Sequence, residues 1–272
     1  MTKRSGFAWA AWIAAVLVVA FLGCTVPVGP EPSEEPPGSA PGIPADGDGR
    51  PRAAVQRVTI DFDAESPGYA GGSFAGSGIV RNPPPGYLDA QAWQILGFSD
   101  GDLLYGEEAT TGDFARGIST GGVSTGGLYA FVVEEGNVAL GVQPTATDFC
   151  PGSISLRIPV TLDSVEEIEL AYTIWVYNDQ NRSSSWTVAV SVDGEIWVDL
   201  PQLTLATDEE ADPAPQWRRT GFAATVPAGE LGIARGAWIH IRWSGADHGG
   251  TGGRDEAAID DISVTLSGTM DE

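Results

Sequence analysis

Four carboxylates lie within seven positions near the end of the chain, in the segment RDEAAIDDISV (residues 254–264). Like charges at this spacing repel one another, and a positive partner would offset the repulsion. Ca²⁺ is the first candidate, because it takes about six to eight oxygen ligands from carboxylates, backbone carbonyls and water. Zn²⁺ is disfavoured, since the chain has 2 His and 2 Cys. The segment runs directly into a β-prone apolar stretch, which places the carboxylates at the start of a strand.

Two other groups of residues suggest catalysis. The segment GISTGGVSTGG (residues 117–127) contains two G-x-S-x-G sequences, but such a nucleophile elbow works at a strand-to-helix corner and no helix follows. Paired carboxylates would suit glycoside hydrolysis. Glu167 and Glu169 alternate, but they precede the apolar part of their strand and are expected to be solvated. No catalytic residues are therefore nominated, and an extracellular, glycosidase-like hydrolase remains the alternative function.

The elements that position these residues are predicted to be strands. Short β-prone runs with period-two alternation are separated by Gly and Pro, and no stretch forms a convincing amphipathic helix. In AWIHIRW (residues 237–243), Trp238, His240 and Arg242 share one face. Asp193-Gly194 separates two runs and predicts a two-residue hairpin turn. Eleven runs are predicted as strands: 57–62, 92–98, 128–133, 138–143, 154–160, 167–177, 186–192, 195–200, 217–224, 237–243 and 258–266. This pattern predicts an all-β fold of two packed sheets.

Five segments then resemble, in order, a bacterial secreted or surface jelly-roll module that is distantly similar to MAM-type and lectin-like sandwiches. They are DFARGISTGGVSTGGLYAF (113–131), ALGVQPTATDFCPGSISLRI (139–158), YTIWVYNDQNRSSSW (172–186), SVDGEIWVDL (191–200) and RDEAAIDDISV (254–264). The resemblance covers nearly all of residues 57–266. It implies a two-sheet jelly roll and an adhesive or ligand-binding role, without implying chemistry.

A second acidic segment, TIDFDAES (residues 59–66), belongs to the first candidate strand. Alternation puts Asp61 and Asp63 on one side. The last strand of a jelly roll commonly lies near the first, so these acids are expected to meet Asp260 and Asp261 and to share a structural Ca²⁺. Related sandwiches use such a cation to close the structure. A solvated acidic rim, or ion pairs to nearby arginines, is the alternative.

Polar side chains in two loops are the candidate ligand contacts. Lectin-like sandwiches stack sugars on aromatic rings and hydrogen-bond them with Asn, Asp and Arg, and the chain has 9 Trp. Turn chemistry and arginine–carboxylate pairing are the alternative roles for these loops. The candidates are Asn178, Asp179, Asn181, Arg182, Asp247 and His248.

The N-terminal part has the layout of a secretory signal, with basic residues followed by an apolar stretch. It closes on AFLGC, which resembles a bacterial lipobox and predicts a lipoprotein signal peptide over residues 1–23 and lipidation of Cys24. Residues 24–54 are rich in Pro, Gly and acids and predict a disordered tether. The jelly-roll domain is expected over residues 55–267, with a short tail over 268–272.

The net charge of the chain limits the classes of molecule that it could bind. The chain has 37 acidic and 14 basic residues, a net charge of −23. This acidic charge argues against nucleic acid as a partner, since binding phosphate needs a basic surface. The sequence therefore predicts a non-catalytic binding or adhesion module, with carbohydrate as a candidate ligand. The module is expected to be held through Cys24 at a bacterial cell envelope, at the outer membrane or the cell surface.

Overall fold

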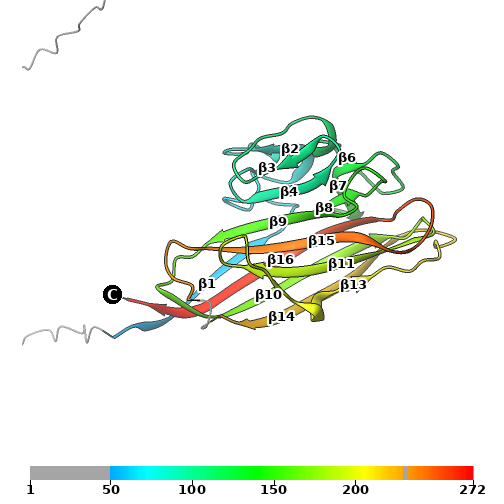
Figure 1. The fold of residues 1–272 in the computed structure, drawn as a ribbon. Coiled ribbons are helices and arrows are strands. Elements are labelled where there is room, and N and C mark those ends of the chain that lie inside the picture. Colours follow the sequence, from blue (N-terminus) through cyan, green and yellow to red (C-terminus); the bar gives the residue numbers. More distant parts are fainter. Residues whose placement is uncertain (1–49, 229–231, 272) are drawn as a thin grey trace, which may run out of the picture. The chain divides into compact units, whose positions relative to one another are not determined.

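A computed structural model describes residues 50–228 and 232–271. The predicted signal peptide, Cys24 and most of the predicted tether lie outside these residues. Within them, strands dominate, joined by turns and two short 3₁₀ helices, η1 (Gly112–Phe114) and η2 (Pro201–Leu203) (Figure 1). No helix in the described ranges is long and apolar enough to span a membrane.

Most of the strands form two seven-stranded sheets. Sheet 1 has the order β14-β10-β16-β8-β7-β6, and β1 also pairs with β16. Its strands are β1 (Arg52–Ile60), β6 (Ile118–Ser119), β7 (Gly127–Glu134), β8 (Asn137–Gln143), β10 (Ser164–Tyr177), β14 (Trp217–Pro227) and β16 (Glu256–Met270). The first and last described strands are thus neighbours, as the sequence predicted.

Sheet 2 has the order β12-β11-β15-β9-β4-β5, and β13 also pairs with β11. Its strands are β4 (Trp93–Phe98), β5 (Gly101–Leu103), β9 (Gly152–Pro159), β11 (Arg182–Ser191), β12 (Val198–Asp199), β13 (Leu205–Ala206) and β15 (Trp238–Gly250). A separate parallel pair is formed by β2 (Phe74–Val80) and β3 (Gly86–Asp89), and β2 contacts β7 and β8 of sheet 1 (Figure 1).

The hydrophobic core lies between the two sheets, because alternate residues of each strand point inward. In sheet 2, Ile239, Ile241 and Trp243 are fully buried, and their ring and methyl groups face the apolar side of sheet 1. Tyr172 of sheet 1 meets Trp243 edge-on, with ring centroids 5.6 Å apart. This arrangement confirms the all-β, two-sheet jelly-roll sandwich that the sequence predicts.

Along one of its edges β16 pairs with two different strands, β1 and β8, and a β-bulge lies between the two paired stretches. Its later half pairs with β1 up to Ile60–Ile262, and its earlier half pairs with β8 from Leu140–Ile259. Between them Asp261 adopts a left-handed φ of 51°, and the register against β10 shifts. A β-bulge of this kind re-aims the side chains around it.

One turn prediction was wrong. Asp193-Gly194 does not close a two-residue hairpin, because β11 and β12 pair only through Ala189–Asp199 and Val190–Val198. The Asp193 carboxylate accepts hydrogen bonds from the N–H groups of Glu195 and Ile196, which opens a wider loop. Gly194 alone supplies the positive φ, 75°, whereas a type I′ turn needs two.

Candidate functional site

The outer face of sheet 2 is built from side chains that alternate with the core residues. The register places Asp199, Ala189, Arg242, Ser155 and Gln94 in one row across five strands. Ala189 and Ser155, on the two sides of the arginine, are small and almost fully buried, so neighbouring side chains cover them. Arg242 is the one long cationic side chain in this row.

In the next row Arg157 lies opposite His240. Its guanidinium carbon is 4.5 Å from the ring centroid of Tyr105 and 4.4 Å from that of Trp238. Its Nε and Nη2 donate to the backbone and side-chain oxygens of Gln91. Arg157 is thus within cation–π distance of two aromatic rings.

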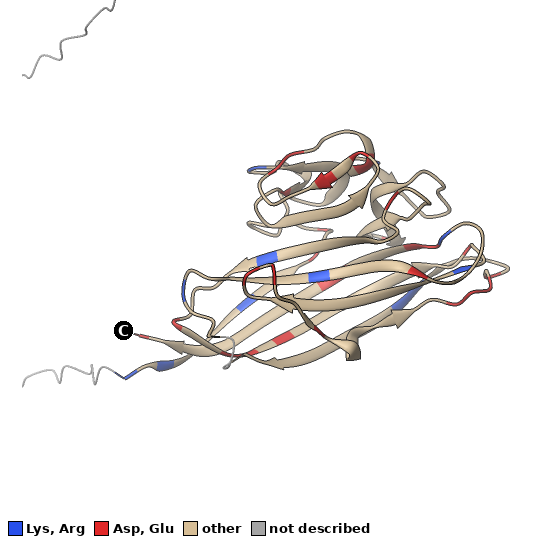
Figure 2. Ribbon diagram, viewed as in Figure 1, with Lys and Arg blue, Asp and Glu red and all other residues tan. Residues whose placement is uncertain are grey.

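Arg242 contacts a third aromatic residue in the same way. Its guanidinium carbon lies 3.9 Å from the ring centroid of Trp197, which comes from the β11–β12 loop. His240 is buried between Tyr105 and Trp197, with its Nδ1 3.4 Å from the Tyr105 hydroxyl. Burial and the charge of Arg157 lower the pKa of His240, so its ring is neutral at neutral pH. Figure 2 shows basic positions on β9 and β15, inside a sheet that is otherwise mostly uncharged.

Exposed apolar side chains border this face. Ile196 is 75% exposed and Val198 43% exposed in the β11–β12 segment, and Leu104 is 47% exposed beside Tyr105. Trp238 is 36% exposed at one end. Exposed apolar groups around a polar floor are typical of interaction sites rather than of a solvated sheet surface. We name the set Tyr105, Arg157, Trp197, Trp238, His240 and Arg242 the aromatic–arginine face.

Two hollows lie at the ends of the aromatic–arginine face. One has a volume of about 280 Å³ and is lined by Trp238, Arg157 and Tyr69 among others. The second has a volume of about 370 Å³ and includes Arg242, Ser153, Ser244 and Asp102. Each hollow combines a stacking or apolar wall with hydrogen-bonding groups. That combination suits a ligand with both apolar faces and hydroxyl groups.

The predicted ligand residues lie elsewhere, in the loops at one end of the sandwich. Asn178 is buried and its Nδ2 donates to the Glu210 carbonyl, while Asn181 Oδ1 accepts from the Ala211 N–H. Asp179 follows β10, and its Oδ1 is buried without a hydrogen-bond partner. These contacts join the β10–β11 loop to residues 210–212, and a role in ligand contact stays a prediction.

Asp247 is the centre of an ionic network in the same region. Its carboxylate pairs with Arg182 at 2.6 Å and with Arg254 at 2.7 Å, and it accepts from the Cys150 thiol. His248 is exposed. The network ties β11, β15 and the segment after β15 together. Arginine–carboxylate pairing, the alternative role that the sequence suggested, is present here, and a ligand role for Asp247 and His248 stays a prediction.

The acidic strand ends come together as the sequence predicted. Burial, together with the negative charges of Asp261, Asp61 and Asp63, raises the pKa of Asp260 to about 7. Asp260 is 1% exposed and its Oδ1 has no hydrogen-bond partner. Asn137, next to the Val138 N–H that donates to Asp63, also has a buried unpartnered Oδ1. In the described residues, however, no three His, Cys, Asp or Glu side chains are arranged closely enough to hold a metal ion.

Asp255 and Glu256, the other two acids of that segment, hold loops in place. Asp255 Oδ1 accepts from the Gln180 N–H, and Glu256 Oε1 accepts from the Val123 N–H. Both side chains are almost fully buried, and burial raises the pKa of each to about 7. The negative charge of Asp179 contributes to both shifts. Their chemistry is therefore that of buried carboxyls without a counter-cation.

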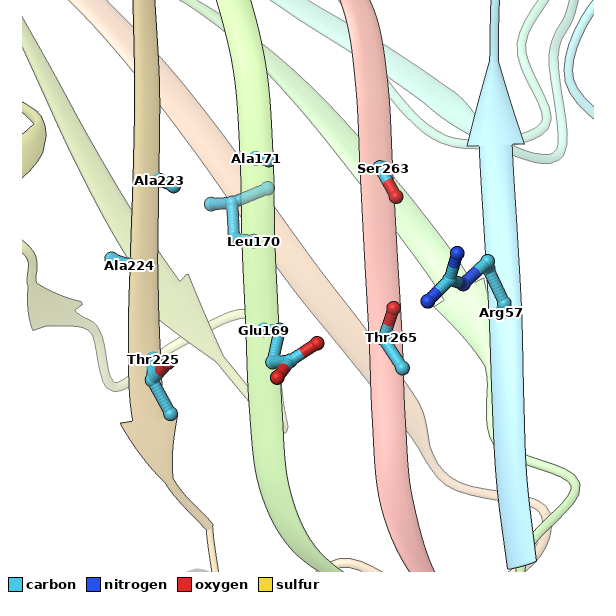
Figure 3. Close-up of a pocket in the computed structure, with 9 residues that line it drawn as sticks. All are labelled: Arg57, Glu169, Leu170, Ala171, Ala223, Ala224, Thr225, Ser263 and Thr265. Atoms are coloured by element: carbon cyan, nitrogen blue, oxygen red, sulfur yellow. The ribbon is translucent and has the colours of Figure 1, made fainter.

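The outer face of sheet 1 carries a different hollow, of about 400 Å³. Arg57, Thr265, Glu169 and Thr225 form one row across four strands. Figure 3 shows the Glu169 and Arg57 side chains on opposite sides of Thr265, with small residues around them. No aromatic residue is among those that line this hollow. It offers polar groups without a stacking surface.

No family model matches the chain, and no curated protein matches it. Several solved structures share part of its strand arrangement. The mannan-recognising carbohydrate-binding module TmCBM27 is 19% identical, with a TM-score of 0.33 over 51% of this chain and 79% of that one. The K3 adhesin domain of Lys-gingipain from Porphyromonas gingivalis is 13% identical, with a TM-score of 0.31 over 54% and 82%.

A third similar structure holds the CBM22-1 and GH10 modules of Clostridium thermocellum xylanase 10B with xylohexaose. It is 14% identical, with a TM-score of 0.35 over 65% of this chain, and the chain spans 27% of that structure's length. Likenesses with TM-scores in this range carry no argument about function.

Sequence reasoning missed most of the aromatic–arginine face. The alternation of AWIHIRW did place Trp238, His240 and Arg242 on one side of a strand. Tyr105 and Trp197 come from loops, and Arg157 comes from a separate strand. The signal that could have found them is the same alternation in ISLRIP (154–159), which puts Arg157 opposite the core residues.

Proposed function

We propose that the chain is a non-catalytic carbohydrate-binding module, and that it binds a glycan across the aromatic–arginine face. The observation that carries the proposal is the arrangement of Trp238, Tyr105 and Trp197 along one face of sheet 2, with Arg157 and Arg242 fixed between them. A sugar ring has apolar faces that stack on aromatic rings and hydroxyls that hydrogen-bond to polar side chains. The face supplies both kinds of contact.

The length of the face supports a chain rather than a single sugar. One hollow contains Trp238, the first residue of β15, and the other contains Ser244, six residues further along the same strand. Six residues of an extended strand span roughly 20 Å, which exceeds one sugar ring. The apolar rims at Leu104 and Ile196 would then lie along the two sides of the bound chain.

A panel of soluble polysaccharides in affinity gel electrophoresis tests the proposal. We expect at least one polysaccharide to retard the protein, and Trp238→Ala to weaken that binding by about tenfold or more, because a Trp that stacks on a ligand commonly contributes more than about 1.4 kcal/mol. Ile118→Ala is the matched control, since Ile118 is 61% exposed on β6 of sheet 1. Retardation that is unchanged in Trp238→Ala would place the ligand elsewhere.

The same assay separates binding from hydrolysis. A hydrolase, the alternative that the sequence left open, would release reducing sugar from the retarding polysaccharide during incubation. We expect binding without release of reducing sugar. Release of reducing sugar in proportion to protein concentration would show that the protein is a hydrolase rather than a binding module.

We also propose a structural Ca²⁺ near Asp260. The buried, unpartnered Oδ1 atoms of Asp260 and Asn137 and the neighbouring carboxylates of Asp61 and Asp63 are oxygen donors of the kind that Ca²⁺ takes. Asp261 is engaged with Thr173 at 3.0 Å and Arg219 at 3.1 Å, so the ion would draw mainly on the other carboxylates. Its contribution would be to hold the end of β1 against the bulge in β16.

Thermal denaturation with and without Ca²⁺ tests this site. At about a hundredfold excess over Kd, an ion that binds only the folded state adds about 2.7 kcal/mol to the free energy of unfolding. We expect Ca²⁺ to raise Tm by several degrees and EDTA to reverse the rise, with no response in Asp260→Asn. Asp208→Asn, in an exposed acidic loop, should respond like the wild type. A Tm that responds to neither Ca²⁺ nor EDTA would mean that the buried Asp260 carboxyl is held without a cation.

A further inference from the structure

Arg242 is the most poorly compensated charge on the aromatic–arginine face. Its Nε is buried and has no hydrogen-bond partner. Burial lowers the pKa of Arg242 from its ordinary value, although the nearby Asp199 opposes the shift. A cation that has lost part of its water without gaining a hydrogen-bonded partner is costly for the fold. A ligand carboxylate that bonded the Nη1 and Nη2 groups would offset part of that cost.

The other arginines make this exception clear. Seven described arginines form ion pairs with Asp or Glu side chains: Arg81, Arg116, Arg182, Arg218, Arg219, Arg235 and Arg254. Arg157 and Arg242 have no such pair with a described carboxylate and stack on aromatic rings instead. In a chain with 37 acidic residues, an arginine without a carboxylate is the unusual outcome. Arg57, on β1 of sheet 1, also forms no such ion pair, but of these three arginines only Arg157 and Arg242 stack on aromatic rings, and those two lie on the same face.

The hollow beside Arg242 also contains groups that suit hydroxyls. Ser153 and Ser244 are paired across β9 and β15 and form its floor, and Asp102 lies at its edge. Asp102 Oδ1 accepts from the Gly97 N–H at 2.8 Å, which fixes the carboxylate. A bare anion would be repelled by Asp102. A ligand with one carboxylate and several hydroxyls would satisfy Arg242, the serines and Asp102 together.

We propose that this hollow selects a sugar acid: a uronic acid residue whose carboxylate binds Arg242 and whose hydroxyls face Ser153, Ser244 and Asp102. The inference rests on the proposed glycan binding and adds its chemical class. A carboxylate is planar and matches the fork of a guanidinium, which accepts it through two parallel hydrogen bonds. Trp197 already orients that fork, so little freedom is lost when the carboxylate binds.

The acidic charge of the rest of the chain shapes this recognition. A net charge of −23 repels a polyanion at long range. The repulsion is largely screened beyond about 8 Å at physiological ionic strength, whereas a direct Arg242–carboxylate contact is much less affected. Selectivity for the acid must therefore come from contact at the hollow, and the test belongs at physiological ionic strength.

The experiment compares short oligosaccharides of galacturonic, glucuronic and mannuronic acid, each beside its methyl ester, by isothermal titration calorimetry. Esterification removes the charge and keeps the sugar backbone. For at least one acid we expect about tenfold or tighter binding than for its ester, a difference of about 1.4 kcal/mol. Arg242→Gln should abolish that preference, and Arg242→Lys should keep only part of it. Arg218→Gln is the matched control, because Arg218 is an exposed arginine paired with Asp212 on sheet 1.

The outcomes separate the two proposals. If esters and neutral polysaccharides bind as tightly as the acids, the sugar-acid inference fails and the glycan-binding module stands. A preference for acids that survives Arg242→Gln would also overturn the inference. If no saccharide binds at all, the proposed function itself fails. A Tm for Arg242→Gln close to that of the wild type excludes loss of the fold as the cause.

Discussion

The guanidinium carbon of Arg242 lies 3.9 Å from the centre of the Trp197 ring, although the two residues come from a central strand and a loop of sheet 2. Trp197 itself is fixed, because its Nε1 donates to the Gly194 carbonyl at 3.2 Å. The loop therefore does more than connect β11 to β12: it sets the direction in which Arg242 presents its donors. Any ligand of this face meets an arginine that is already oriented.

This relationship predicts a measurable coupling. In a double-mutant cycle of Trp197→Ala and Arg242→Ala, we expect a coupling of about 0.5–1 kcal/mol in the free energy of unfolding, the usual size of an exposed cation–π contact. Urea denaturation of the wild type, the two single variants and the double variant measures it. Strictly additive effects would mean that the stacking does not contribute to stability.

The core predicts a much larger effect at Trp243. Its side chain is fully buried and meets Tyr172 across the two sheets. Trp243→Ala should lower the free energy of unfolding by about 3–5 kcal/mol, since it leaves a cavity at the centre of the sandwich. Ile196→Ala, at a 75% exposed position, should change it by less than about 0.5 kcal/mol. Similar losses in the two variants would be inconsistent with this core.

The buried carboxyls predict how stability depends on pH. Burial raises the pKa of Asp255 and Glu256 to about 7 in the folded protein, whereas unfolded carboxyls titrate near 4. Between these values the folded state binds more protons than the unfolded state. The free energy of unfolding is therefore highest below about pH 4 for these groups and falls as pH rises through about 7. We expect a higher Tm near pH 5 than near pH 8, measured by circular dichroism.

Two comparisons sharpen that measurement. Asp255→Asn and Glu256→Gln should each reduce the slope without removing it, because the pKa of Asp260 is raised to about 7 by burial and acts in the same direction. Asp148 acts oppositely: burial raises its pKa, but hydrogen bonds from Thr145 and Ser99 bring it to about 2. Its contribution is lost only in stronger acid. A Tm that rises steadily from pH 5 to about pH 8 would contradict the sign of this prediction.

The lipid anchor predicted from AFLGC lies outside the described residues and stays a prediction. Cys24→Ala should move the protein from the membrane fraction to the soluble fraction, or leave the signal peptide uncleaved. Fractionation of the expressing cells and metabolic labelling with a fatty acid measure this. A variant that fractionates and labels like the wild type would exclude lipidation of Cys24.

Much of the fold could be predicted from the sequence because most of its long strands alternate. The runs that became β10, β11, β15 and β16 show apolar residues at every second position, and this period depends only on local geometry. β2 and β3 could not be predicted in the same way. Their segments, FAGSGIV and GYLD, are short and rich in glycine, and their parallel pairing depends on contacts with distant parts of the chain.

The candidate site was less predictable for a related physical reason. The meeting of Asp61 and Asp260 follows from the pairing of the first and last strands, which the jelly-roll resemblance implied. The neighbours of Arg242 depend on register and on two loops. Tyr105 and Trp197 reach the face only because those loops fold back over sheet 2. A periodic pattern of apolar residues predicts strands, but it does not predict how a loop folds.

The pairing of Arg52 with Met270 brings the two ends of the described domain together. Its two ends lie side by side on the outer edge of the β1–β16 ladder, so a short linker would join them without moving a strand (Figure 1). The chain could then be opened at an exposed loop such as residues 207–210, which lies between β13 and β14. Such a circular permutant would keep every strand pair of sheet 2 and present the same aromatic–arginine face from a different starting point.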